Sequence, residues 1–224
     1  MRCVIYSLLA CGIGLGGVGS ASAAFITDPA GDFLASYTGP RGGDLDVLNA
    51  EVTLLQSSFR FTTQLNGTVG TTAGAFYVWG VDRGQGTSRF AGLGLSGVLF
   101  DSVVVVRPDG TGQFTDLVTT PSPTTTLLAP GSVTISGDTI TAIVPIALLT
   151  SRGLTPAQYT WNLWPRLPGG NPNIPQPIAD FAPDNSNAPV TAVPEPASLI
   201  TLMLGGFTAA LGLRRRLLTG SNLA

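Results

Sequence analysis

The most constraining feature of the sequence is an uncharged apolar run near the C-terminus. It extends over residues 197–213 and is closed by Arg214, Arg215 and Arg216. At about 1.5 Å per helical residue it reaches roughly 25 Å, near the lower limit for crossing the hydrocarbon of a bilayer. Guanidiniums stop transfer, because each costs ~2.5 kcal/mol or more in hydrocarbon. The sequence therefore predicts one transmembrane helix over this run, a stop-transfer cluster at the three arginines and a cytoplasmic tail over 217–224.

A short proline motif, Val193-Pro194-Glu195-Pro196, directly precedes the apolar run. Together, the motif, the span and the arginines closely resemble the PEP-CTERM sorting signal, with the sorting segment at 194–216. The resemblance implies recognition by exosortase, a membrane-embedded processing enzyme, followed by removal or transfer of the tail. It also implies transient anchoring in the inner membrane, then a cell-surface or extracellular location, often beside extracellular polymer. A plain tail anchor is the alternative.

The N-terminus carries a second targeting pattern. A minimal positive start and an apolar run lead to Ala21-Ser22-Ala23, which predicts a signal peptide over residues 1–23, read by the Sec export machinery. Leu8 to Cys11 reads like a lipobox, so lipidation of Cys11 is the alternative. Cleavage after Ala23 removes both cysteines and leaves no thiol or disulfide chemistry.

Composition excludes most catalytic chemistry. The chain has no histidine, and all 11 of its basic residues are arginine. Catalytic triads with histidine, histidine-ligated zinc and Schiff-base or P-loop lysines are therefore impossible. Between residues 24 and 193 only seven arginines oppose twelve acids, so we expect no nucleic-acid partner.

The remaining stretch of about 170 residues predicts one all-β domain. Short runs rich in Val, Thr, Phe and Leu alternate with Gly, Pro, Asn and Asp, which favours an antiparallel β-sandwich ectodomain over 24–185. A Pro- and Asn-rich linker is expected at 186–193. The predicted strands are Asp46 to Gln56, Ser58 to Leu65, Ala75 to Val81, Val98 to Arg107, Gln113 to Val118, Ser132 to Ile135, Thr139 to Pro145 and Gln158 to Leu163.

Local patterns add detail to this sandwich. Pro108 to Gly112 and Ser136 to Asp138 supply residues that tolerate positive φ, so they should close hairpins. Alternation over Ser58 to Leu65 predicts a half-buried strand. The only helical hints are Ile146 to Ser151 and Thr155 to Ala157, which are too short to form a packed layer.

Four early acids form a candidate calcium site. Asp28, Asp32, Asp44 and Asp46 fall within nineteen positions, and calcium prefers oxygen ligands on adaptable loops. The layout over residues 28–65 is loosely similar to extracellular sandwiches of the DOMON and family 9 carbohydrate-binding-module type, which implies a structural calcium or sugar site. The alternative is that these carboxylates cap turns through hydrogen bonds. No other cofactor is expected.

Aromatic residues form a candidate sugar platform. Tyr77 and Trp79 share one strand face, and Tyr159 and Trp161 share another. Exposed rings in an extracellular sandwich can stack on sugars, whereas buried rings are core. The alternation alone fits both interpretations.

The sequence therefore predicts a non-enzymatic exported protein of the envelope or extracellular matrix. The alternative is a module that binds extracellular polysaccharide. A glycosidase would need paired carboxylates, and the nearest pairs, Asp180 with Asp184 and Asp44 with Asp46, sit equally well in turns.

Overall fold

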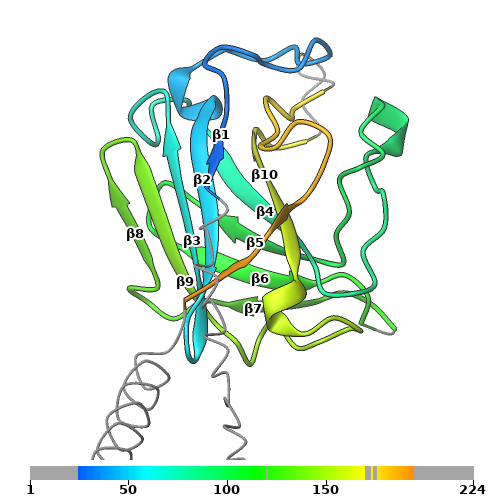
Figure 1. The fold of residues 1–224 in the computed structure, drawn as a ribbon. Helices are drawn as coiled ribbons and strands as arrows, with labels where there is room; N and C mark the ends of the chain where they lie inside the picture. The colour runs from blue at the N-terminus through cyan, green and yellow to red at the C-terminus, as the bar shows by residue number, and fades with distance from the viewer. Residues whose placement is uncertain (1–24, 120, 170–172, 174–175, 194–224) are drawn as a thin grey trace, which may run out of the picture.

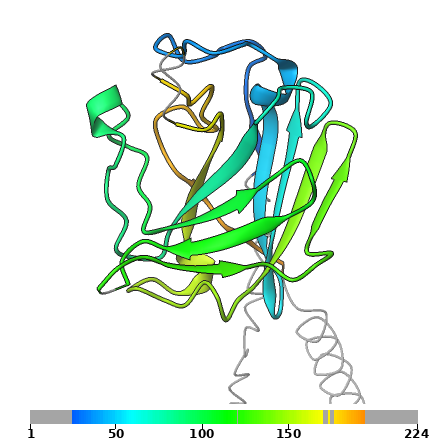
Figure 2. The same ribbon diagram turned by 180° about the vertical axis from the view of Figure 1, so that it is seen from behind.

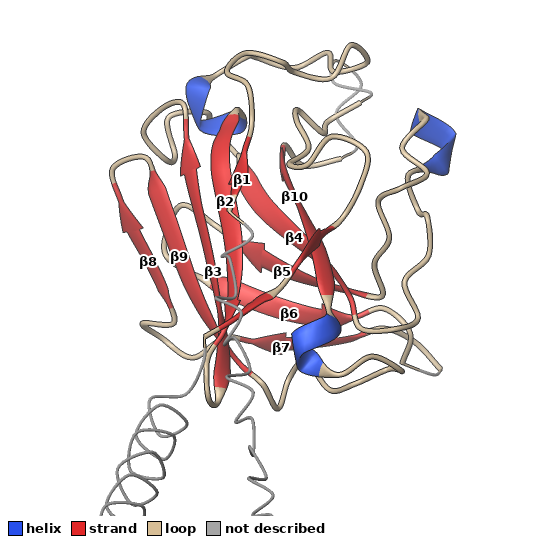
Figure 3. Ribbon diagram, in the orientation of Figure 1, coloured by secondary structure: helices blue, strands red, loops and turns tan. Residues whose placement is uncertain are grey.

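The computed structural model describes residues 25–119, 121–169, 173 and 176–193 of the chain. Two six-stranded, mainly antiparallel sheets dominate this part (Figure 1), and the helical content is three short 3-10 turns (Figure 3). The all-β prediction is confirmed. The predicted signal peptide with Ala21 and Ala23, the motif from Pro194 and the apolar run lie outside the described residues. Within the described part, no helix has the length and apolar character needed to cross a bilayer.

The first sheet has the order β1-β2-β3-β9-β8, with β12 also paired to β2, and the second has the order β11-β10-β4-β5-β6-β7. Only the β12–β2 pair is parallel among the strand pairs of the described chain. Strands β5 to β7 run across the strands of the first sheet (Figures 1 and 2). The strands are β1 Ile26–Thr27, β2 Val47–Leu54, β3 Ser58–Leu65, β4 Phe76–Asp82, β5 Ser102–Val106, β6 Gly112–Asp116, β7 Thr124–Leu127, β8 Val133–Ser136, β9 Thr139–Pro145, β10 Thr160–Arg166, β11 Ala188–Pro189 and β12 Thr191–Ala192. The 3-10 turns are η1 Gly43–Leu45, η2 Ala91–Leu93 and η3 Pro156–Gln158.

Most strand predictions are confirmed, because alternation and turn residues determine them locally. Each of the eight predicted runs overlaps one observed strand, and both predicted hairpins close, between β5 and β6 and between β8 and β9. In β3, Phe59, Phe61, Thr63 and Leu65 are buried, while the residues that alternate with them are partly exposed. Strand β7 was not predicted: all four of its residues are exposed at the sheet edge, so it carries no apolar alternation.

The predicted sugar platform is wrong, because its rings form the core between the sheets. Tyr77, Trp79, Tyr159 and Trp161 are all 0% exposed. Tyr159 stacks on Phe59 at 5.7 Å between ring centroids, which fixes it against the first sheet. The four rings therefore pack in the core, which is the alternative that the alternation in the sequence also fitted.

The predicted free linker at 186–193 is also wrong. Residues 178–192, here called the closing strap, follow the edge of the second sheet and end on the first (Figure 1). Strand β11 pairs with β10, and β12 then pairs with β2. Ala188, Val190 and Thr191 are buried. The strap joins the two sheets, because its backbone pairs with β10 of the second sheet and with β2 of the first. Its apolar side chains Ala188 and Val190 are buried in the core.

Candidate metal centre

Five aspartates from three separate segments lie close together. The segments that carry them, the loop after β1, the start of β2 and the closing strap, meet at the upper end of the sandwich in Figure 1. Asp28 and Asp32 lie in the loop that follows β1. Asp46 lies between η1 and β2, and Asp180 and Asp184 belong to the closing strap. We call these five side chains the acidic cluster.

Backbone pairing holds the three segments together. Strand β1 pairs with β2, and the Asp28 N–H donates to the Leu48 carbonyl at 2.9 Å. The strap lies beside β10, where the Ala182 N–H donates to the Leu163 carbonyl at 2.8 Å. The cluster is therefore positioned by sheet register as well as by loops.

The carboxylates fall into two groups of three that share Asp32. One group is Asp32, Asp46 and Asp180, and the other is Asp28, Asp32 and Asp184. In each group, one oxygen of every residue lies within 4.8 Å of the others. Because Ca²⁺–oxygen bonds are about 2.3–2.6 Å long, oxygens on opposite sides of one ion lie about 5 Å apart, so each group matches the size of a calcium shell.

Several of these oxygens are buried without a hydrogen-bond donor. Asp46 and Asp180 are each 1% exposed, and Asp28 is 7% exposed. Among the described residues, Asp46 Oδ1, Asp28 Oδ2 and Asp32 Oδ1 have no hydrogen-bond partner. A buried carboxylate oxygen without a partner is costly, so a cation, a proton or a bound water has to supply the missing interaction.

Hydrogen-bond donors hold Asp46 and Asp180 in place. Asp46 Oδ2 accepts hydrogen bonds from the Gly31 N–H at 2.8 Å and from Asn66 Nδ2 at 2.9 Å, which orients its free Oδ1. Asp180 is held through both oxygens, because Oδ2 accepts from the Val47 N–H at 2.9 Å and Oδ1 accepts from the Phe181 N–H at 2.7 Å. Such outer contacts are the usual way in which proteins fix metal ligands before the ion arrives.

Electrostatics in the cluster favours neutralisation. Burial, followed by the charges of Asp180 and Asp32, raises the pKa of Asp28 to about 8. Burial also raises the pKa of Asp180 to about 7, although the Val47 N–H opposes this, and burial raises the pKa of Asp32. Near neutral pH, Asp28 and Asp180 therefore bind protons in the absence of a metal, and a divalent cation would displace those protons.

Asp44, the fourth predicted ligand, does not join the cluster. Its carboxylate accepts hydrogen bonds from the backbone N–H groups of Gly70, at 3.1 Å, and Thr72, at 2.9 Å, and from the Thr72 hydroxyl. It caps a loop, which is the alternative that the sequence left open. Asp180 and Asp184 take part instead; the sequence marked them only as an acidic pair, because nothing local links them to residues more than 130 positions earlier.

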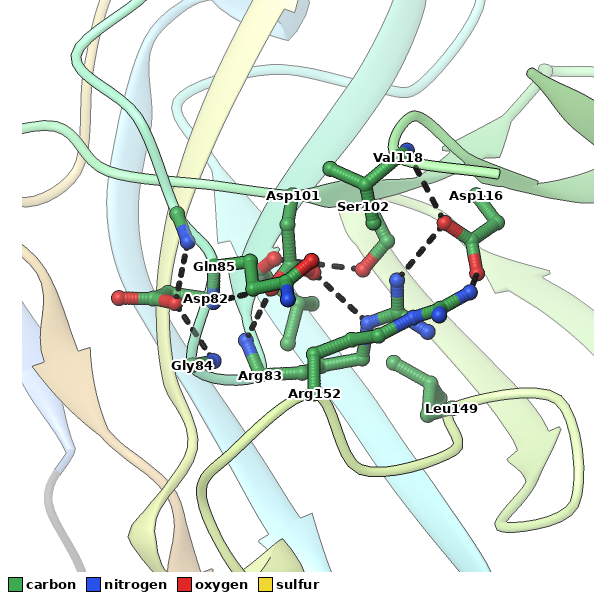
Figure 4. A network of polar contacts seen from close by, with 12 residues as sticks. Asp82, Arg83, Gly84, Gln85, Asp101, Ser102, Asp116, Val118, Leu149 and Arg152 are labelled. Atoms are coloured by element: carbon green, nitrogen blue, oxygen red, sulfur yellow. Dashed lines mark hydrogen bonds and ion pairs between the residues drawn. The ribbon is translucent and has the colours of Figure 1, made fainter. Parts of the chain in front are cut away.

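A second group of buried charged residues lies next to Arg83, which directly follows the last residue of β4, and is shown in Figure 4. Arg83 is 0% exposed, and its Nε lies 2.7 Å from Asp101 Oδ1 while its Nη2 lies 3.0 Å from Asp116 Oδ1. Arg152 Nη2 lies 2.6 Å from Asp116 Oδ2. We call these four side chains the arginine network. Two cations face two anions, so the network is internally neutral and leaves no ligand position open.

Comparison with known proteins does not assign the chain to a family. No protein-family model matches the chain, and no curated protein shows significant similarity to it.

Proposed function

We propose that this protein is an exported, non-enzymatic β-sandwich of the envelope or extracellular matrix that binds calcium at the acidic cluster. One observation carries the calcium proposal: Asp46 Oδ1 is buried without a hydrogen-bond partner while Asp46 Oδ2 is held by two donors, inside a group of carboxylates of calcium size. Turn capping explains Asp44, but it leaves this oxygen unexplained.

The ligand chemistry selects calcium over other common metals. The cluster offers only carboxylate oxygens, and the chain has no histidine, so zinc and the later transition metals lack their preferred ligands. Magnesium requires a nearly ideal octahedron and gives up its water reluctantly, whereas calcium accepts irregular oxygen shells. Extracellular calcium modules typically have a Kd of roughly 10⁻⁴–10⁻³ M, a range that suits an exported domain.

The terminal sequences support the cellular part of the proposal. The signal-peptide pattern supports export by the Sec machinery. The resemblance of Val193 to Arg216 to a PEP-CTERM segment supports anchoring in the bilayer and recognition by exosortase. The described domain ends directly before this segment, since β12 finishes at Ala192. Extracellular polysaccharide remains a proposed partner, but its binding surface is not the buried aromatic set.

Calcium binding is tested by titration calorimetry on the full chain in detergent micelles. We expect saturable heat with Ca²⁺, a much weaker response to Mg²⁺ and a loss of affinity of at least tenfold in Asp46→Asn. The matched control is Asp109→Asn, which changes an exposed carboxylate in the β5–β6 turn. Equal Ca²⁺ affinity in Asp46→Asn and Asp109→Asn contradicts the site.

The sorting proposal is tested by mass spectrometry of the protein from its native host. We expect the mature form to begin at Ala24 and to lack the residues after the Pro-Glu-Pro motif. A Glu195→Ala variant should retain the full tail and accumulate in the membrane. A mature wild-type pool that extends to Ala224 contradicts recognition by exosortase.

A further inference from the structure

We infer that the acidic cluster binds two calcium ions bridged by Asp32, an enclosed inner ion and a solvent-exposed outer ion. The inference rests on the proposed calcium function and adds the number of ions and their separate roles. The inner ion lies among Asp32, Asp46 and Asp180, and the outer ion lies among Asp28, Asp32 and Asp184.

The geometry favours two positions over one. The five carboxylates do not form a single group of mutually close oxygens; they divide into two groups with one member in common. A single ion with bonds of about 2.5 Å cannot contact both groups fully. Asp32 has two carboxylate oxygens and can therefore offer one to each ion.

The charge of the acidic cluster also favours two ions. The ion pairs among the described residues include none with a member of the acidic cluster, so five carboxylates face each other without a protein cation. With all five carboxylates ionised, one Ca²⁺ leaves three negative charges at a site that is largely buried. Two ions reduce the excess to one, a charge that the backbone donors of Gly31, Val47 and Phe181 can stabilise.

Exposure separates the two ions. Asp46 and Asp180 are buried, so the inner ion is enclosed by protein. Asp184 is exposed and Asp32 is partly exposed, so the outer ion completes a shell of six to eight oxygens with water. We expect the inner ion to bind more tightly and dissociate slowly, and the outer ion to exchange quickly.

The outer ion has a distinct structural effect. It joins Asp28, just after β1, to Asp184 in the closing strap, which continues through β11 and β12 to Val193. Calcium bound at the outer position therefore stabilises the packing of the closing strap, which precedes the sorting motif. The inner ion instead links the strap, through Asp180, to Asp46 just before β2.

The test is the number of Ca²⁺ ions bound by the full chain in detergent, measured by equilibrium dialysis and by calorimetry. We expect two ions with affinities at least tenfold apart. Binding of one ion overturns this inference but leaves the calcium function intact. Binding of none overturns both.

Two variants assign the positions. Asp184→Asn, at an exposed side chain, should remove only the weaker ion and leave the slow phase of Ca²⁺ release to a chelator unchanged. Asp180→Asn should remove the tighter ion. Asp109→Asn should keep both ions. Loss of the tighter ion in Asp184→Asn, or equal loss in both cluster variants, contradicts the inner and outer assignment; the stoichiometry of the wild type does not depend on whether a variant folds.

Discussion

The arginine network and the acidic cluster show two solutions to the same problem at opposite ends of one sandwich. In the network, Arg83 and Arg152 neutralise Asp101 and Asp116 within 3.0 Å. In the acidic cluster, five carboxylates meet with no described protein cation beside them. Burial of charge alone therefore does not mark a binding site. An uncompensated buried charge does, because its partner must come from outside the chain.

Disruption of the arginine network should reduce stability more than any other change considered below. Arg83→Met removes the guanidinium between Asp101 and Asp116 and leaves Asp101 buried without its ion-pair partner. We expect a loss of about 3–5 kcal/mol in the free energy of unfolding, measured with urea. The matched control is Arg60→Met, whose partly exposed arginine lies 3.8 Å from Glu51 and should cost less than about 1 kcal/mol. Similar losses in the two variants contradict the structural role of the network.

Removal of calcium is the next largest effect, because it turns the acidic cluster into an uncompensated charge. At about one hundred times Kd, one bound ion adds about 2.7 kcal/mol of stability, which corresponds to roughly 5–10 °C in melting temperature for a domain of this size. We therefore expect EGTA to lower the melting temperature of the wild type by this amount. Addition of Mg²⁺ should restore little of it. An unchanged melting temperature in EGTA contradicts the view that the cluster depends on an external cation.

The stability contributions of the acidic cluster and the arginine network should depend on pH with opposite sign. In EGTA, the pKa of Asp28 at about 8 and that of Asp180 at about 7 exceed the ordinary value of 3.8, so the folded state holds protons that the unfolded state releases. Their contribution to stability is fully present below about pH 4 and is lost as the pH rises toward 8. Asp32, Asp46 and Asp184 surround Asp28 and strengthen the trend.

Asp116 in the arginine network follows the opposite course. Burial alone would raise its pKa, but hydrogen bonds from Arg152 and Arg83 lower it to about 2. Its contribution is present above about pH 4 and is lost as the pH falls toward 2. Urea unfolding from pH 2 to 8 in EGTA measures both slopes. The loss toward pH 8 should be smaller in Asp28→Asn than in the wild type, while the loss toward pH 2 persists. An equal loss toward pH 8 in Asp28→Asn and in the wild type contradicts the assignment. Saturating Ca²⁺ should abolish the loss toward pH 8, because the ion replaces the protons.

Much of the fold could be predicted because its signals are local. The alternation in Phe59 to Leu65 and the glycines of the two hairpin turns act within a few residues, and the structure follows them. Strand β7 and the closing strap could not be predicted in this way. Strand β7 consists mainly of exposed threonines, which give no apolar alternation. The closing strap is defined by pairing with β10 and β2, and β2 lies far from the strap in the sequence.

The candidate site was predictable only in part, for a related reason. Asp28, Asp32 and Asp46 were recognised from their density in the sequence, and all three belong to the cluster. Asp180 and Asp184 enter through the sheet register that lays the strap beside β10, which no short motif encodes. The aromatic residues were ambiguous, because alternation alone cannot say which face of a strand is covered by a second sheet.

The smallest expected effect separates Asp44 from its neighbour Asp46. The two acids are two positions apart, but Asp44 lies within η1 and Asp46 lies between η1 and β2, and the Asp44 carboxylate accepts hydrogen bonds from the loop at Gly70 and Thr72. Asp44→Asn keeps one acceptor oxygen and loses the charge, so we expect a loss of about 1 kcal/mol in unfolding free energy with unchanged calcium affinity. Asp46→Asn should show the reverse, a large loss of calcium affinity with little loss of stability in EGTA. Calorimetry and urea unfolding on both variants measure these effects. A drop in calcium affinity in Asp44→Asn would return Asp44 to the metal shell and remove the distinction between a capping carboxylate and a ligand.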